Sequence, residues 1–151
     1  MTRRTLLGLA TLLFMSLPAV SQTKASPAAD PSLYKRLGGY DAIAAVSDDF
    51  VVRLVTDKQL GRFLVGLSDN SKSRLRQNFI DQVCQATGGP CVYVGRDTKT
   101  AHKGLGITGS DWDQSVKLLV ETLDKFKVPQ KEKDDLLAIV SSLKPDIVEK
   151  P

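Results

Sequence analysis

His102 is the single histidine of the chain, and a neutral imidazole is the commonest nitrogen ligand of protein-bound metals. Zinc would need about four protein ligands in a structural site and about three in a catalytic one, and one histidine with two cysteines does not supply them. Both methionines lie in the leader-like first residues. A histidine-based hydrolytic triad would need a nucleophile motif near His102, and the sequence has none. If a metal binds, the sequence favours one axial imidazole with the opposite coordination position open.

The first residues have the pattern of a secretory signal. Arg3 and Arg4 form a positive start, the apolar stretch that follows is too short to span a bilayer, and residues 19–21 offer small side chains at a cleavage position. We therefore expect a signal peptide over residues 1–21, a flexible linker over 22–31, and an exported protein that is periplasmic or secreted. An uncleaved membrane anchor is the alternative, and a partial twin-arginine pattern leaves the export route open.

The predicted mature chain is nearly neutral. Loss of the signal removes two arginines and no acid, so the net charge falls from +4 to +2. That charge gives no electrostatic footprint for nucleic acid, and we expect no nucleic-acid partner and no stable membrane anchor after cleavage. About 120 residues suffice for one domain with a core and one buried ligand.

The mature sequence has helical periodicity throughout and predicts an all-α fold. The expected helices span residues 40–56, a short stretch from Asp57 to about 65, residues 71–87, a turn capped by Asp97, residues 110–127, and a last helix from Pro129 to Pro145. Ser110 and Asp113 are expected to cap the fifth of these. Its apolar stripe comprises Trp112, Val116, Leu119, Leu123 and Phe126.

Several short motifs occur in a fixed order along the mature chain. They are Ser32-Leu33-Tyr34 with Gly38-Gly39, Asp48-Asp49-Phe50, Gly88-Gly89-Pro90, Tyr93-x-Gly95-Arg96-Asp97, Ala101-His102-x-Gly104-Leu105-Gly106-Ile107 and Val128-Pro129. In this order and spacing the chain resembles a group I truncated haemoglobin. The resemblance implies a two-over-two helical sandwich around haem b over residues 32–148, with His102 as the proximal iron ligand. The haem is not expected to be attached as in c-type proteins, because the chain lacks Cys-x-x-Cys-His.

The resemblance also assigns the distal side of the haem, where this chain departs from many members. Val51 stands where a tyrosine is common, Leu75 where a classical globin has histidine, and Phe79 where a glutamine often pairs with that tyrosine. The aromatic that contacts the haem edge aligns with Leu64, or with Phe63 in a shifted register. The predicted cofactor-binding residues are Phe50, Val51, Phe63, Leu64, Leu75, Phe79, Lys99, His102, Ile107 and Trp112.

This distal set offers no strong hydrogen-bond donor, so bound oxygen should be released quickly. Asn78 and Gln82 are the nearby polar candidates, and helical geometry turns Gln82 mostly away from the Leu75–Phe79 row. Lys99 is either a partner of a haem propionate or a solvated surface lysine. Cys84 and Cys91 either form a disulfide in an oxidising compartment or remain buried thiols.

The sequence therefore predicts an exported haem-binding globin that reversibly binds oxygen or another diatomic gas, such as nitric oxide or carbon monoxide. One alternative is a haem enzyme, a nitric oxide dioxygenase or a peroxidase-like protein. It would need an external reductase, since the chain has no flavin or nicotinamide segment. Another alternative is a haem-free helical interaction module.

Overall fold

The computed structural model describes residues 31–150, and their regular structure is helical. In chain order the elements are α1 (Leu33–Arg36), α2 (Gly39–Thr56), the 3-10 helix η1 (Gly61–Phe63), α3 (Asp69–Ala86), α4 (Thr98–His102), α5 (Gly109–Lys125), α6 (Gln130–Ser142) and α7 (Lys144–Ile147). Extended pairing in this range is limited to one bridge between Thr108 and Lys150. The predicted all-α class is confirmed. The predicted signal peptide lies outside the described residues, as does the linker up to residue 30.

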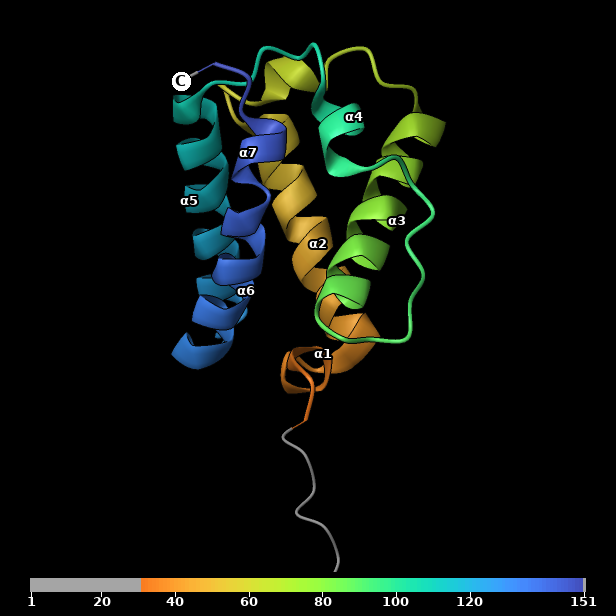
Figure 1. Cartoon of the computed structure of the whole chain (residues 1–151), viewed down its shortest axis with the longest axis vertical. Helices are drawn as coiled ribbons and strands as arrows, with labels where there is room; N and C mark the ends of the chain where they lie inside the picture. Colours follow the sequence, from red (N-terminus) through yellow and green to blue (C-terminus); the bar gives the residue numbers. More distant parts are fainter. Residues whose placement is uncertain (1–30, 151) are drawn as a thin grey trace, which may run out of the picture.

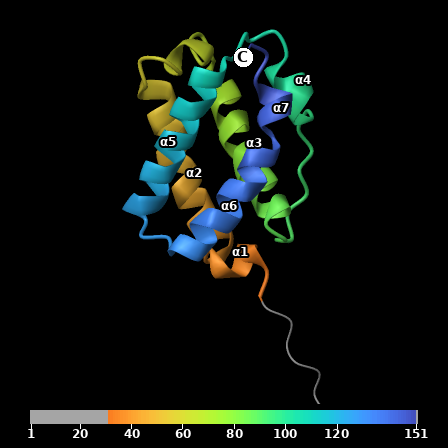
Figure 2. The same cartoon turned by 60° about the vertical axis from the view of Figure 1, so that its left-hand side comes forward.

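Two pairs of long helices form the body of the molecule. Helix α2 packs against α3 on one side and against α5 on the other, and Figures 1 and 2 show α5 and α6 side by side. The short helices α4 and α7 contact each other at one end of this body. Among residues 31–150, no helix combines the length and the apolar character needed to cross a membrane. This arrangement is the predicted two-over-two sandwich, and it places α4 beside α3 and α7.

The main core lies between α2, α5 and α6. Its buried members are Phe50, Leu60, Leu118, Leu119, Leu123 and Leu136. A second, smaller cluster joins α2 to α3 through Ile43, Ile80 and Cys84. The predicted stripe of α5 holds for Trp112, Leu119 and Leu123, which are buried, but not for Phe126, which is 40% exposed. Helix α5 ends at Lys125, so its repeat no longer determines where the next side chain points.

The predicted start of α5 was wrong by two residues. Thr108 is the N-cap, with an extended backbone, and its hydroxyl accepts from the Asp111 N–H. In turn, the Asp111 carboxylate accepts a hydrogen bond from the Thr108 N–H at 2.9 Å. The capping box is therefore Thr108–Asp111 and not Ser110–Asp113, since Ser110 already lies within the helix.

Three other boundaries also differ from the sequence prediction. The stretch from Asp57 to about 65 contains only η1, because the Asp57 carboxylate accepts from the N–H groups of Gln59 and Leu60 at 2.8 Å each and closes a tight turn. Helix α3 begins earlier, at Asp69, after the N-cap Ser68. The last predicted helix is divided at Leu143, and Pro145 lies in the first turn of α7, where its missing N–H costs nothing.

Candidate functional site

The His102 imidazole is held by the backbone of its own short helix. Its Nδ1 lies 2.7 Å from the carbonyl oxygen of Thr98, one helical turn earlier. A carbonyl oxygen only accepts hydrogen bonds, so Nδ1 carries the proton and donates. The Nε2 lone pair of this tautomer is then available to a metal, and the ring is fixed in orientation.

The start of α4 is tied to its surroundings at two points. The Asp97 carboxylate accepts from the Thr100 N–H at 2.8 Å, and the hydrogen bonds from Thr100 hold the pKa of Asp97 below its usual range. Asp97 therefore caps α4 as predicted. The Thr98 hydroxyl accepts from the side-chain amide of Gln82 on α3 at 3.1 Å. Gln82 thus reaches α4, in keeping with the prediction that it turns away from the row of Leu75 and Phe79.

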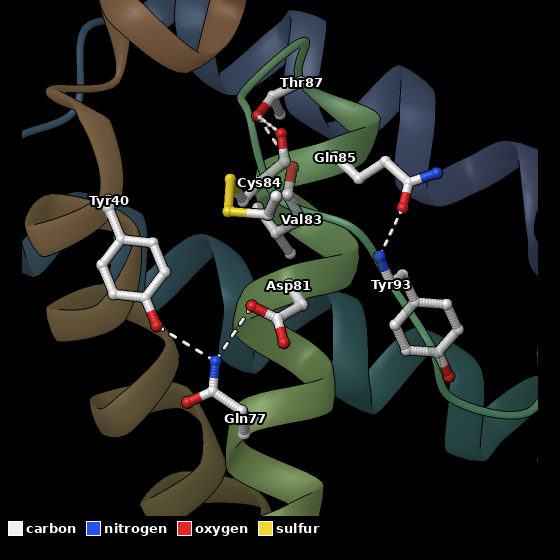
Figure 3. The surroundings of a disulfide bond; sticks show 9 residues. Tyr40, Gln77, Asp81, Val83, Cys84, Gln85, Thr87 and Tyr93 are labelled. Atoms are coloured by element: carbon white, nitrogen blue, oxygen red, sulfur yellow. Dashed lines mark hydrogen bonds between the residues drawn. A yellow bond between two sulfur atoms is a disulfide. The ribbon is translucent and has the colours of Figure 1, made fainter.

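The loop that leads into α4 is fastened to the last turns of α3. Cys84 and Cys91 form a disulfide with their Cα atoms 5.8 Å apart. Next to the disulfide in the sequence, the Gln85 side chain accepts a hydrogen bond from the Tyr93 N–H at 2.6 Å (Figure 3). Of the two states left open for the cysteines, the structure has the disulfide. Together with Gln82–Thr98, these bonds position the segment that carries His102.

Three predicted distal residues meet at one cavity of about 260 Å³, which we call the outer cavity. It lies between the end of α2, the segment after η1 and the start of α3. Its lining is Val51, Val52, Val55, Thr56, Leu64, Leu67, Lys72 and Leu75. Leu64 lines this cavity, whereas Phe63 packs against the core and lies under the Arg62 guanidinium, 4.6 Å from the ring centroid.

Phe79 lies at a second, smaller cavity of about 40 Å³, the inner cavity. Its ring centroid is 5.3 Å from that of Phe50, so the two aromatic side chains form a packed pair between α3 and α2. The inner cavity is apolar except for Ser47, whose hydroxyl already donates to the Ile43 carbonyl oxygen at 2.7 Å. Neither Phe79 nor Ser47 therefore offers a free hydrogen-bond donor to a small ligand there.

Four further predicted residues are not among those that line the two cavities. Ile107 and Trp112 are buried, His102 is half-buried, and Lys99 is exposed on the surface of α4. Their contacts with a haem remain predictions.

The described residues fit a haem. The outer cavity is lined almost entirely by aliphatic side chains, which suit the apolar face of a porphyrin. His102 supplies one imidazole nitrogen with its other nitrogen bonded to a backbone carbonyl, the arrangement typical of histidines that bind metals. Val51, Leu64 and Leu75 would contact the group and His102 would bind its iron, which would supply the gas-binding chemistry.

Sequence reasoning did not identify two parts of this site. Thr98 acts through its carbonyl oxygen, which every residue type has, so only the spacing to His102 could have suggested it. Glu149 accepts from the N–H groups of Gly104 and Gly106 in the turn after His102. A glutamate near a chain end carries no sequence signal for such a contact.

Comparison with known proteins places the chain among globins. The family model described as bacterial-like globin matches residues 32–149. A group 1 truncated haemoglobin of Mycolicibacterium paratuberculosis is 34% identical over 124 residues, which cover 82% of this chain and 87% of that protein. The group 1 truncated haemoglobin of Synechocystis is 32% identical, with 74% of this chain and 88% of that protein covered.

Solved structures agree with these sequence matches. The Fe(III) form of truncated haemoglobin from Tetrahymena pyriformis superposes with a TM-score of 0.72 at 22% identity, covering 78% of this chain and 98% of that one. The two-over-two haemoglobin of Synechococcus, solved with covalently attached haem, gives a TM-score of 0.71 at 28% identity with the same coverage. The chain therefore belongs to the bacterial-like globin family and is a haem-binding globin of the group I truncated kind.

Proposed function

We propose that the protein holds haem b through Nε2 of His102 and reversibly binds a diatomic gas, oxygen first among them. The observation that carries this proposal is the bond between His102 Nδ1 and the Thr98 carbonyl oxygen, 2.7 Å long. It sets the tautomer and the orientation that an axial ligand needs. The haem iron supplies the gas-binding chemistry when the group is bound.

The distal side supports weak retention of oxygen. Val51, Leu64 and Leu75 present aliphatic side chains to the outer cavity, and none of them donates a hydrogen bond. The similarity to truncated haemoglobins favours gas binding over enzymatic turnover and over a haem-free interaction module. Turnover would also need an external reductase.

The assignment of His102 is tested by absorption spectroscopy of the full chain, as isolated, after reduction, and with carbon monoxide. Wild type is expected to bind one haem b, and His102→Ala to lose it or hold it weakly. Arg96→Ala is the matched control, because Arg96 is exposed in the loop just before the same short helix. A His102→Ala protein with the wild-type spectrum and haem affinity would contradict the proposal.

We also propose that the protein is exported after cleavage near residue 21. The charged start and apolar run support export, and so does the Cys84–Cys91 disulfide, since disulfides persist in oxidising compartments. Mass spectrometry of the native protein should find an N-terminus close to residue 22 in the exported fraction. An intact Met1 in a cytoplasmic pool would be the opposite result.

A further inference from the structure

The carboxylate of Glu149 bonds the turn that directly follows His102. One oxygen accepts from the Gly104 N–H and the other from the Gly106 N–H, each at 2.6 Å. Gly104 and Gly106 have φ angles of +82° and +67°, which only glycine adopts readily. Because both backbone N–H groups converge on one anion, the turn forms a small carboxylate-binding concavity. Charge-assisted bonds of this kind are about twice as strong as neutral ones.

The backbone around Glu149 extends this contact along the chain. The Glu149 N–H donates to the Ile107 carbonyl oxygen at 2.9 Å, and the Gly109 N–H donates to the Lys150 carbonyl oxygen at 3.1 Å. Residues 149–150 therefore run beside residues 104–109, while α7 packs against α4. Residues 149–150 thus bond the connection between α4 and α5 at Gly104, Gly106, Ile107 and Gly109.

Hydrogen bonds therefore hold the chain both before and after His102. Before it, Gln82 on α3 holds Thr98, whose carbonyl oxygen orients the imidazole. After it, Glu149 holds the turn of Gly104 and Gly106. The N–H groups of Gly104 and Gly106 keep the pKa of Glu149 below its usual range, so the side chain is the charged acceptor at neutral pH.

We infer that Glu149 is a positioning residue for His102: by binding the Gly104–Gly106 turn, it fixes the proximal helix and so strengthens the hold of the imidazole on the haem iron. This inference rests on the proposed function. Without the carboxylate, a turn containing two glycines regains many backbone conformations, because glycine has more conformational freedom to lose than other residues. The orientation of α4, and with it of the imidazole, is then less restricted.

The test compares Glu149→Ala and Glu149→Gln with wild type in the full, haem-loaded chain. Glutamine keeps one acceptor oxygen and loses the charge, so it should give a smaller effect than alanine. Glu121→Gln is the matched control, since Glu121 on α5 pairs with Arg53 at 3.2 Å and does not touch the turn. The readouts are the rate of haem transfer to an acceptor apoglobin, the iron–histidine stretching frequency in resonance Raman spectra, and amide hydrogen exchange at Gly104 and Gly106 in the haem-free protein.

Glu149→Ala is expected to release haem about tenfold faster, as loss of about 1.4 kcal/mol would give, and to lower or broaden the iron–histidine band. Amide exchange at Gly104 and Gly106 should rise, while Glu121→Gln leaves all three readouts unchanged. If Glu149→Ala keeps the wild-type haem release and iron–histidine band, the positioning role is wrong, even where exchange increases. A wild-type spectrum in His102→Ala would instead remove the proposed function itself, so the two failures are distinguishable.

Discussion

The Gln82 side-chain amide donates to the Thr98 hydroxyl across 3.1 Å, and the Thr98 carbonyl oxygen in turn accepts from His102. A residue of α3 is thus linked to the His102 imidazole, the proposed iron ligand, through one intermediate residue. The glutamine lies on the helix that also carries Leu75 and Phe79, which we assign to the opposite side of the proposed haem site. Changes within this helix should therefore alter how firmly the haem is held.

Replacing Gln82 by leucine removes the bond to Thr98 and preserves side-chain size. A typical hydrogen bond contributes about 1 kcal/mol net, so haem release should accelerate by about fivefold. Gln77→Leu is the control on the same helix, where Gln77 instead bonds the Tyr40 hydroxyl and Asp81 (Figure 3). Equal release rates for the Gln82 and Gln77 variants would show that the Thr98 contact does not restrain the proximal helix.

Installing a hydroxyl at the outer cavity should slow the release of oxygen. Val51 lines this cavity beside Leu64 and Leu75, and a tyrosine there would donate a hydrogen bond to the ligand. We expect Val51→Tyr to lower the oxygen dissociation rate by about tenfold, corresponding to about 1.4 kcal/mol. Stopped-flow measurement on the haem-loaded chain checks this.

The control for this change is Val92→Tyr, at a position that is 72% exposed in the loop before α4. It should release oxygen like wild type. If wild type already retains oxygen as strongly as Val51→Tyr, another donor faces the ligand, and the candidates are Lys72, which lines the outer cavity, and the half-buried Asn78 of α3.

Removing the disulfide should destabilise the whole domain. Cys84 and Cys91 are separated by seven positions, and closing such a short loop stabilises the folded chain by about 2–3 kcal/mol. Cys84→Ala/Cys91→Ala should lower the free energy of unfolding in urea by this amount. A reductant should lower the unfolding free energy of wild type by the same amount, whereas the unfolding free energy of the double variant should not change. An unfolding free energy of wild type that is independent of reductant would contradict this prediction.

Acid should destabilise the protein through Asp111. Burial of this carboxylate opposes its ionisation, but hydrogen bonds from Gln59 and Thr108 and the charge of Arg62 outweigh burial and lower the pKa from 3.8 to about 2. Because the pKa of Asp111 is lower in the folded than in the unfolded protein, its ionisation stabilises the fold at pH values above the unfolded pKa of 3.8. This stabilisation is lost as the pH falls towards the folded pKa of about 2. The decrease in the free energy of unfolding on protonation of Asp111 is about 2 kcal/mol.

Urea unfolding at several pH values measures this effect. Asp111→Asn should be less stable at neutral pH and should lose less stability on acidification than wild type. Asp113→Asn serves as the control, because Asp113 is exposed two positions further along α5. Parallel pH profiles for wild type and Asp111→Asn would rule out the proposed contribution.

The long helices and the two-over-two fold could be predicted from the sequence, because they depend on local periodicity and on an ordered set of motifs. The start of α5 could not, because Ser110 and Thr108 are both competent N-caps, and Asp111, which bonds Thr108, also accepts from Gln59 and Arg62 of another segment. Sequence periodicity describes one helix at a time and does not include the contacts of Asp111 with residues 59 and 62.

Three of the residues assigned to the distal side line one cavity, but the sequence did not predict this arrangement. The sequence left Phe63 and Leu64 as alternatives, and the turn formed by Asp57 and η1 directs Leu64 to the outer cavity. The bonds that restrain α4 were not predictable either. Gln82–Thr98 and Glu149–Gly104 join positions far apart in the sequence, and glutamine and glutamate occur on most surfaces for other reasons.

The pairing of Phe50 with Phe79 constrains how this distal pocket can evolve. A glutamine at position 79 would place a polar amide against the Phe50 ring beside the apolar inner cavity, where a side-chain amide without a hydrogen-bond partner costs free energy. A tyrosine at position 51 would not incur this loss of stability, because Val51 lines the outer cavity. The order of mutations therefore matters. A lineage moving from this pocket towards the tyrosine–glutamine type would acquire the tyrosine first, and the glutamine only after compensating changes around Phe50.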